Sequence, residues 1–405
     1  MVKIKQREGK MKRFLIFSLI FLLFKSSYGE GIDSVVKANN RFSFDIYRKI
    51  SSRNKNKNIF LSSYSIFSAL AITYEGAKGK TADEIKSVFH FPEKDVLRAN
   101  FSKIYRNLNK KKKLYILHTV NALWIQKDYG CLKSYIDVVR NYYGGEIKGV
   151  DFINETEKTR RLINDFIEDK TNKKIKDLIP KGALNPLTRL VITNAIYFKG
   201  LWKWEFDRKK TRKMKFYMSR KDYVEVPMMC MEPEKARFNY ADLDRLEILE
   251  LPYKGKDISM LILLPKKSIE EVESILTIEK FEEWKSKMRP TKFDEIYLPK
   301  FEIEEKYSLK NILSEMGMPT SFSPSADFSA ITGKKELFIS DVIHQAYVKV
   351  DEKGTEAAGA TAVIFVLSAG PGKKRIFKAD HPFIFIIQEK NTGNILFVGK
   401  VFKPV

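Results

Sequence analysis

The sequence predicts a single α+β domain, and two observations lead to this fold class. Helical patterns dominate the first half of the chain and strand patterns dominate after residue 200, yet no linker rich in proline, glycine or serine separates the halves. The chain of 405 residues is long enough for two or three domains, but the missing linker favours one. A composition that is 44% hydrophobic and 13% aromatic supplies the apolar surface that a large core requires.

Apolar periodicity and a capping signal define the predicted elements near the start of the domain. Residues 32–50 carry an apolar stripe at helical spacing. Residues 58–61 have the pattern of a short strand, which leads into an apolar helix over residues 66–74. Thr81 is followed three residues later by Glu84, and this spacing predicts a capping box at the start of the next helix.

The rest of the chain is predicted to be mainly strands. They are expected at residues 114–125, 190–198, 223–226, 246–251, 258–264, 296–303, 337–350, 383–388 and 395–401. An amphipathic helix with a charged outer face is expected around residues 162–167.

The segment 353–375 fits no packed element. Small residues crowd its first half, and Gly370-Pro371-Gly372 interrupts it near the end. With a period of two, one face of the segment would carry Thr355, Ala357, Gly359, Thr361, Val363 and Phe365. The sequence therefore predicts a surface loop that is able to become a strand.

The N-terminus is predicted to be a secretory signal peptide over residues 1–29. A basic stretch precedes the apolar run of 11 residues from Phe14 to Phe24, and small side chains at Ser27 and Gly29 suit cleavage after Gly29. Such a run rises only about 16 Å as a helix, which is roughly half a bilayer. We therefore expect a secreted, soluble domain over residues 30–405, with no membrane span. The two cysteines, Cys131 and Cys230, are too few for a disulfide framework.

The chain is strongly basic, with a net charge of +24 from 74 lysine and arginine residues against 50 acidic ones. Residues 90–113 hold eight basic and two acidic side chains, and residues 199–221 hold ten and two. Such runs are usually solvated faces. The aromatic residues within these runs form no pattern that suggests base stacking, so we expect no specific nucleic-acid partner.

Enzymatic and metal chemistry have little support in the sequence. The segment 76–81 is a near miss to a phosphate-binding loop, because Tyr74 stands where the first glycine is needed. The four histidines lack metal-ligand spacing, no GxSxG motif occurs, and strand packing explains the methionines around Cys230 better than copper binding does. We expect no enzyme, no metal and no required cofactor. A triad hidden among Ser, His and Asp residues stays open as an alternative.

Several segments, in a fixed order, resemble those of the serpin family across the whole mature chain. They are residues 58–62 with Ser65, 193–202, 298–300, 325–329, 344–356 and 377–383. One departure is Ser63, where serpins usually carry proline. The resemblance implies a single domain with a large central mixed β-sheet, further sheets, about eight or nine helices and an exposed reactive-centre loop within residues 352–377.

The resemblance also implies a monomeric protease inhibitor that acts as a suicide substrate. A serine protease, or a cysteine protease, attacks the loop, and the acyl-enzyme is trapped when the loop inserts into the central sheet. The family's spacing implies a hinge formed by Glu352, Gly354, Thr355, Glu356, Ala357, Ala358, Gly359 and Ala360. The inward-facing positions of this hinge carry neither charge nor proline, which favours insertion.

The same spacing places the reactive bond at Ser368–Ala369. This bond suits an elastase-like or subtilisin-like protease, whereas a shift to Leu367 would favour chymotrypsin-like or cysteine proteases. A non-inhibitory serpin, with a carrier, chaperone or storage role, remains the alternative.

Two supporting clusters follow from the resemblance. The polar cluster beneath the sheet, called the shutter, is expected at Ser62, Ser65, Asn194 and His344. The cluster at the top of the sheet, called the breach, is expected at Trp202, Lys300 and Glu352, with the last two as an ion pair. Residues 90–113 resemble a helix that binds heparin-like polyanions in some members. A sulfated polysaccharide could therefore bind as an activator at Lys103, Arg106, Lys110, Lys111, Lys112 and Lys113, although lysine-rich runs are more often solvated faces.

Overall fold

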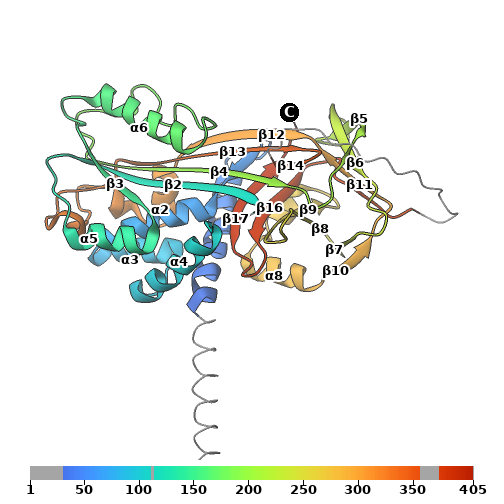
Figure 1. Ribbon diagram of the computed structural model, residues 1–405, viewed down its shortest axis with the longest axis horizontal. Helices are drawn as coiled ribbons and strands as arrows, with labels where there is room; N and C mark the ends of the chain where they lie inside the picture. Colours follow the sequence, from blue (N-terminus) through green and yellow to red (C-terminus); the bar gives the residue numbers. More distant parts are fainter. Residues whose placement is uncertain (1–30, 111–113, 356–373, 405) are drawn as a thin grey trace, which may run out of the picture.

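A computed structural model describes residues 31–110, 114–355 and 374–404 (Figure 1). Three β-sheets and their helices form this part of the chain, so the predicted α+β class is confirmed. The predicted signal peptide and most of the predicted loop lie outside the described residues. No helix of the described ranges is long and apolar enough to cross a membrane.

The central sheet has six strands and is mixed, as expected. Its order is β12 (Phe301–Ser308), β13 (Asp341–Asp351), β14 (Gly354–Thr355), β4 (Leu190–Leu201), β2 (Tyr115–Gln126) and β3 (Glu146–Val150). The two long strands β13 and β4 run parallel and pair directly over residues 341–347 and 191–197. At one end of this pairing, the two-residue strand β14 lies between them.

Two further sheets complete the frame. The seven-stranded sheet runs β1 (Ile59–Leu61), β17 (Ile395–Val401), β16 (Phe383–Glu389), β9 (Ile258–Pro265), β8 (Leu246–Pro252), β7 (Arg237–Asp242) and β10 (Arg289–Lys292). The four-stranded sheet runs β15 (Ile376–Lys378), β11 (Glu295–Pro299), β6 (Tyr223–Met231) and β5 (Asp207–Tyr217). Strands β9, β16 and β17 are buried along their whole length, which matches their continuous apolar sequences.

Helices cover both faces of the central sheet. In Figure 1, α6 (Thr156–Lys170) lies over one face, and α2 (Ser63–Gly76) with its neighbours lies under the other. The remaining helices are residues 31–51, α3 (Gly79–Phe89), α4 (Lys94–Leu108), α5 (Lys133–Val138) with the π-helix Val139–Tyr143, α7 (Ile269–Glu273), α8 (Ile278–Ser286), α9 (Lys310–Met316), the 3-10 helix Pro319–Phe322 and α10 (Ser329–Thr332). Every residue of α2 is buried, because this mainly apolar helix passes through the core and the polar side chains that it carries are small or hydrogen-bonded there.

The predicted capping box at Thr81 and Glu84 is wrong. Helix α3 begins at Gly79, two residues earlier, and no side chain caps it. The Thr81 hydroxyl instead accepts a hydrogen bond from the Asp327 backbone amide at 2.9 Å. The Glu84 carboxylate accepts from the amide and the hydroxyl of Thr320, at 2.9 and 2.7 Å. Partners distant in the sequence thus use the groups that a capping box would need.

The strand predicted over residues 296–303 is two strands in two different sheets. The chain leaves the four-stranded sheet at Pro299 and joins the central sheet at Phe301, with Lys300 at the crossing. The strand predicted over 337–350 begins only at Asp341. Before it, the Ile339 amide donates to the Ser321 carbonyl, outside the sheet, and the Ser340 amide donates to the Leu190 carbonyl at the start of β4. Apolar patterning continues through both boundaries and therefore does not reveal them.

Candidate functional site

The site begins at the turn between β13 and β14, where the chain reverses direction within the central sheet. Val350 pairs with Thr355 and Asp351 with Gly354, and the same two hinge residues pair on their other side with β4. The hinge strand β14 therefore separates β13 from β4 at this end of the sheet. The other hinge residues, Glu356, Ala357, Ala358, Gly359 and Ala360, lie outside the described residues, as do Leu367, Ser368 and Ala369.

Hydrogen bonds fix the turn on both sides. The Asp351 carboxylate accepts from the backbone amides of Lys353 at 2.9 Å and Gly354 at 3.2 Å, which closes the turn from within. The Trp202 amide donates to the Lys353 carbonyl at 2.7 Å, and the Phe206 amide donates to the Glu352 carbonyl at 2.8 Å. The turn is therefore held to the segment that follows β4.

Glycine is required at position 354 because the backbones approach too closely for a side chain. A Cβ atom there would lie 2.1 Å from the Gly200 carbonyl oxygen. At Gly200 itself, a Cβ would meet the rings of Phe198 and Tyr253 at 2.8 Å. Both glycines allow the turn to sit against β4.

Beneath the turn, three buried side chains form a stack. The hydroxyls of Thr355 and Tyr253 are 2.6 Å apart. The Tyr253 ring stacks on Trp202 with 4.5 Å between ring centroids, and the indole Nε1 donates to the Asp351 carbonyl at 3.0 Å. Burial raises the pKa of the Tyr253 phenol, which stays neutral and able to bond to Thr355. Sequence reasoning named Trp202 but missed Tyr253, which lies 102 positions before its partner.

The predicted ion pair between Lys300 and Glu352 is present. The Lys300 Nζ lies 3.0 Å from the Glu352 Oε2, and the Thr211 hydroxyl donates to the Oε1 at 2.9 Å. Burial alone would raise the pKa of Glu352, but hydrogen bonds from the backbone, Lys300 and Thr211 outweigh it and lower the pKa below its ordinary value. Because only 5% of the Glu352 side chain is exposed, this pair is less screened by solvent than a surface pair.

The four predicted shutter residues are brought together in the core under the central sheet. The His344 Nε2 accepts from the Ser62 amide at 3.1 Å, and its Nδ1 lies 2.6 Å from the Asn194 Oδ1. The Asn194 side-chain amide donates to the Ser65 carbonyl at 2.7 Å. It also donates to the Asn121 Oδ1 at 2.5 Å, which adds a residue that the sequence did not indicate.

Burial sets the charge state of His344. It lowers the pKa of the imidazole to about 3, so the ring is neutral at physiological pH. Since Nε2 accepts a hydrogen bond, the single proton resides on Nδ1 and is donated to Asn194.

This histidine bond crosses the seam between the two long strands. His344 of β13 and Asn194 of β4 are direct neighbours in the parallel register. Any new strand that enters the sheet between β13 and β4 must break the bond between these side chains. The seam therefore has the hinge strand β14 at one end and the hydrogen bond between His344 and Asn194 near its middle.

The basic residues predicted to bind polyanions lie on and after α4. Arg106 is exposed, Lys103 is half-buried with its ammonium 3.3 Å from the Asn100 Oδ1, and Lys110 follows the helix. The other three, Lys111, Lys112 and Lys113, lie outside the described residues. Within the described ranges, no group of three or more His, Cys, Asp or Glu side chains could hold a metal ion, and neither cysteine is in a disulfide.

Three β-sheets, with a two-residue hinge strand between the long parallel strands β13 and β4 at one end of the central sheet, define the fold of the described residues. A family model described as "Serpin (serine protease inhibitor)" matches residues 37–404. The chain belongs to the serpin family.

Relatives and solved structures agree with this assignment. A serpin-like protein of Methanosarcina acetivorans is 43% identical over 91% of this chain and 86% of its own length. Human Serpin B3 is 38% identical over 92% of this chain and 100% of its own length. Uncleaved ovalbumin superposes with a TM-score of 0.83 at 31% identity, covering 92% of this chain and 100% of its own. Human thyroxine-binding globulin in complex with its hormone gives 0.84 at 30% identity, covering 93% and 100%.

Proposed function

We propose that this protein is an exported inhibitor that traps serine proteases as a suicide substrate. One observation carries the proposal: the hinge strand β14 already separates β13 from β4 and bonds to both. The chain that follows Thr355 therefore starts in line with the seam that it would fill. The description of the family, "Serpin (serine protease inhibitor)", supports a protease partner.

The proposed reaction begins as ordinary proteolysis. The protease's serine oxygen attacks the carbonyl carbon of Ser368, an ester forms, and the peptide bond to Ala369 breaks so that Ala369 leaves as a free amine. Attack at Leu367 would give the same chemistry with chymotrypsin-like or cysteine proteases, the latter through a thioester. Insertion of the loop then carries the acyl-enzyme along before water can hydrolyse it.

The length of the loop suits this displacement. From Glu352 to Ser368 an extended chain spans about 55 Å, at roughly 3.3 Å per residue. The Glu352 carboxylate, held by Lys300 and Thr211, anchors the start of the segment. New backbone hydrogen bonds to β13 and β4 would replace those lost at the seam, and the free energy released would drive the trap.

Export and polyanion binding belong to the same proposal. The signal at residues 1–29 would deliver the inhibitor to extracellular proteases, and the mature domain would act as a monomer. A sulfated polysaccharide would bind the basic side chains of α4 and the residues that follow it.

A second candidate is a non-inhibitory carrier. The similarity to a thyroxine-binding globulin that holds its hormone shows that a protein of this fold binds a small molecule. Under this alternative the loop would be cleaved without forming a covalent complex.

Mixing the mature protein with a small protease panel tests the proposal. The panel contains elastase, subtilisin, chymotrypsin, trypsin and a papain-like enzyme. Each mixture would be run on a denaturing gel, and mass spectrometry would give the mass of the released C-terminal peptide. A covalent band with a peptide that begins at Ala369 is expected with elastase or subtilisin. Cleavage without a covalent band for every enzyme would contradict inhibition and favour the carrier.

A further inference from the structure

We propose that strand β5 is a docking surface for an acidic face of the target protease. The inference rests on the proposed inhibitory function and adds to it the charge of the partner. It is carried by three observations: the unpaired charge of β5, its contacts with residues before and after the predicted loop, and the exposed tyrosines of β5 and β6.

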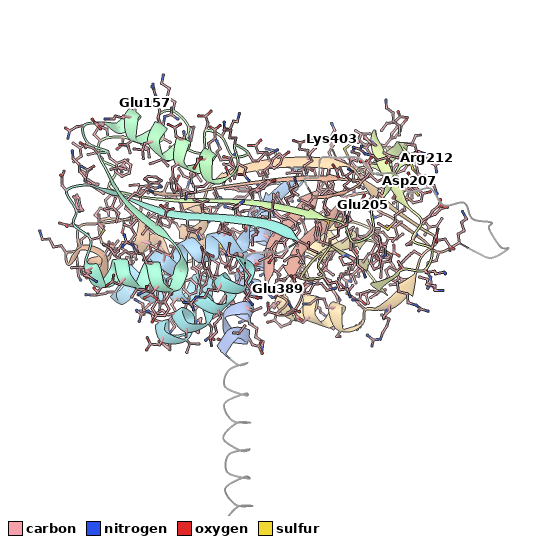
Figure 2. The ribbon with its side chains drawn as sticks, in the orientation of Figure 1. Glu157, Glu205, Asp207, Arg212, Glu389 and Lys403 are labelled. Carbon is pink, nitrogen blue, oxygen red and sulfur yellow. The ribbon has the colours of Figure 1, made fainter. Side chains whose placement is uncertain are left out.

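Strand β5 is the most basic element of the four-stranded sheet. Within Asp207–Tyr217, its basic residues are Arg208, Lys209, Lys210, Arg212, Lys213 and Lys215, and all of them are exposed. The strand forms the edge of the sheet and pairs only with β6. Figure 2 labels Asp207 and Arg212 at the end of the molecule where β5 lies.

Most of this charge is not neutralised by the protein. Lys210 pairs with Glu232, and Arg208 reaches Glu352 only at 4.0 Å. Counting only partners in the described ranges, no ion pair involves Lys209, Arg212, Lys213 or Lys215. Arg212 interacts electrostatically with Glu295, but the neighbouring cations of this row also repel each other. An anionic partner would gain from this row.

The strand is tied to both ends of the predicted loop. The Thr211 hydroxyl bonds to Glu352, just before the loop, at 2.9 Å. The Tyr217 amide donates to the carbonyl of Asp380, just after the loop, at 2.8 Å. Strand β5 thus runs alongside the base of the loop, and three strand spacings, about 14 Å, separate it from β15.

A protease bound to the loop would cover this strand. Protease–inhibitor interfaces bury about 800 Å² on each partner, which is a patch roughly 30 Å across. The basic row would then face the rim of the protease's active-site cleft. Opposite charge on that rim would speed association by about ten- to a thousandfold at low salt.

Exposed tyrosines favour a protein partner over a polysaccharide. Tyr217 and Tyr223 are 41% and 46% exposed and pair across β5 and β6 with 6.0 Å between ring centroids. The Lys215 Nζ lies 4.2 Å from the centre of the Tyr223 ring. Tyrosine is enriched at protein–protein hot spots, whereas a polyanion chain requires charge alone.

The test measures docking without trapping. Each protease of the panel is prepared with its nucleophile replaced by alanine, and its association rate is measured at about 25 and 150 mM NaCl. The variant K209Q/R212Q/K213Q/K215Q is compared with the wild type. With at least one protease we expect association to be about tenfold slower for the variant at low salt, and its salt dependence to flatten.

A matched control removes four exposed positive charges far from the loop, as K173Q/K176Q/K181Q/K334Q. It lowers the net charge equally, and its rates should stay within twofold of the wild type. Equal slowing by both variants, or no slowing by the β5 variant with any protease, would overturn the proposal. If the β5 variant is no longer retained on heparin-agarose but its association rates with the proteases are unchanged, β5 binds a polyanion and the proposal is overturned. The covalent band with active proteases tests the proposed inhibitory function separately. If the inactive proteases dock but the active ones form no covalent band, the inhibitory function fails while the docking surface stands.

Discussion

At the scale of single residues, Thr355 decides whether the loop can enter the sheet. Its side chain is 1% exposed and points into the stack with Tyr253 and Trp202. A long cation at this position would have to be buried without a counter-ion, and the cost of that burial would oppose insertion.

Thr355→Arg should therefore convert the inhibitor into a substrate. We expect the covalent band to be lost while the loop is still cut, and the number of inhibitor molecules consumed per protease to rise at least tenfold. Titration of active protease measures this number. Thr355→Ser keeps the hydroxyl that bonds to Tyr253 and should behave like the wild type. Unchanged stoichiometry in the arginine variant would contradict trapping by insertion of the loop.

His344 predicts how acid affects the sheet. Its folded pKa, lowered to about 3 by burial, lies below the ordinary value of 6.5, so the unfolded chain binds the proton more readily. The stability that His344 contributes is therefore complete above pH 6.5 and is lost as the pH falls toward 3. His381 acts in the opposite direction. Burial lowers its pKa, but bonds to Asp380 and the Pro265 carbonyl outweigh this and leave it raised, so its contribution is lost as the pH rises.

Thermal unfolding at pH 7 and pH 5 separates these contributions. We expect the melting temperature of the wild type to fall on acidification, and His344→Gln to melt lower at pH 7 but to lose less between the two pH values. His381→Gln serves as the control, because its loss on acidification should be at least that of the wild type. Identical pH dependence in wild type and His344→Gln would contradict the burial of a neutral imidazole at the seam.

The sequence predicted the shutter residues because each lies in a recognisable segment. It did not predict Asn121 or Tyr253, since these contacts join positions 73 and 102 residues apart and depend on strand register. Register is set by the pairing of β2 with β4, which no local pattern encodes.

At the scale of elements, the N-terminus of α2 links the core helix to the shutter. The Ser62 hydroxyl accepts from the Ser65 amide at 3.2 Å and donates to the Leu396 carbonyl at 2.7 Å. The hydroxyl is buried, so its removal leaves both groups without a partner.

Ser62→Ala should consequently destabilise the protein by about 2–3 kcal/mol. Thr277→Ala removes the cap of α8 at a more exposed position, where water can replace the bonds that the Lys280 amide and the Glu279 carboxylate lose, and should cost about 1 kcal/mol or less. Urea unfolding measures both values. Equal losses in the two variants would show that the Ser62 hydroxyl caps a helix and does nothing more.

Elements also show where sequence patterns stop being informative. The strongly periodic helix at residues 31–51 and the apolar strands β9, β16 and β17 were predicted close to their observed positions. Strand β5 was missed, because its row of charges resembles a solvated run and its pairing with β6 decides its conformation. The helix start at Gly79 was misplaced because tertiary partners bind Thr81 and Glu84.

At the scale of the whole molecule, the central sheet must open between β13 and β4 to accept one more strand. The direct pairing of β13 with β4 ends at Tyr347 and Tyr197, and beyond it β14 occupies the gap. A cleaved loop would extend this hinge strand through the seam and break the bond between His344 and Asn194. The inserted form would gain backbone bonds on both sides of the new strand, so it should be more stable than the intact form.

Thermal unfolding before and after cleavage of the loop is the most direct test of loop insertion between β13 and β4. The loop would be cut by a protease that the inhibitor does not trap, and far-UV circular dichroism would follow melting of the intact and cleaved proteins. We predict that cleavage raises the melting temperature by on the order of 10 °C or more. The cleaved Thr355→Arg variant, whose loop should not insert, provides the control. An unchanged or lower melting temperature after cleavage of the wild type would contradict loop insertion.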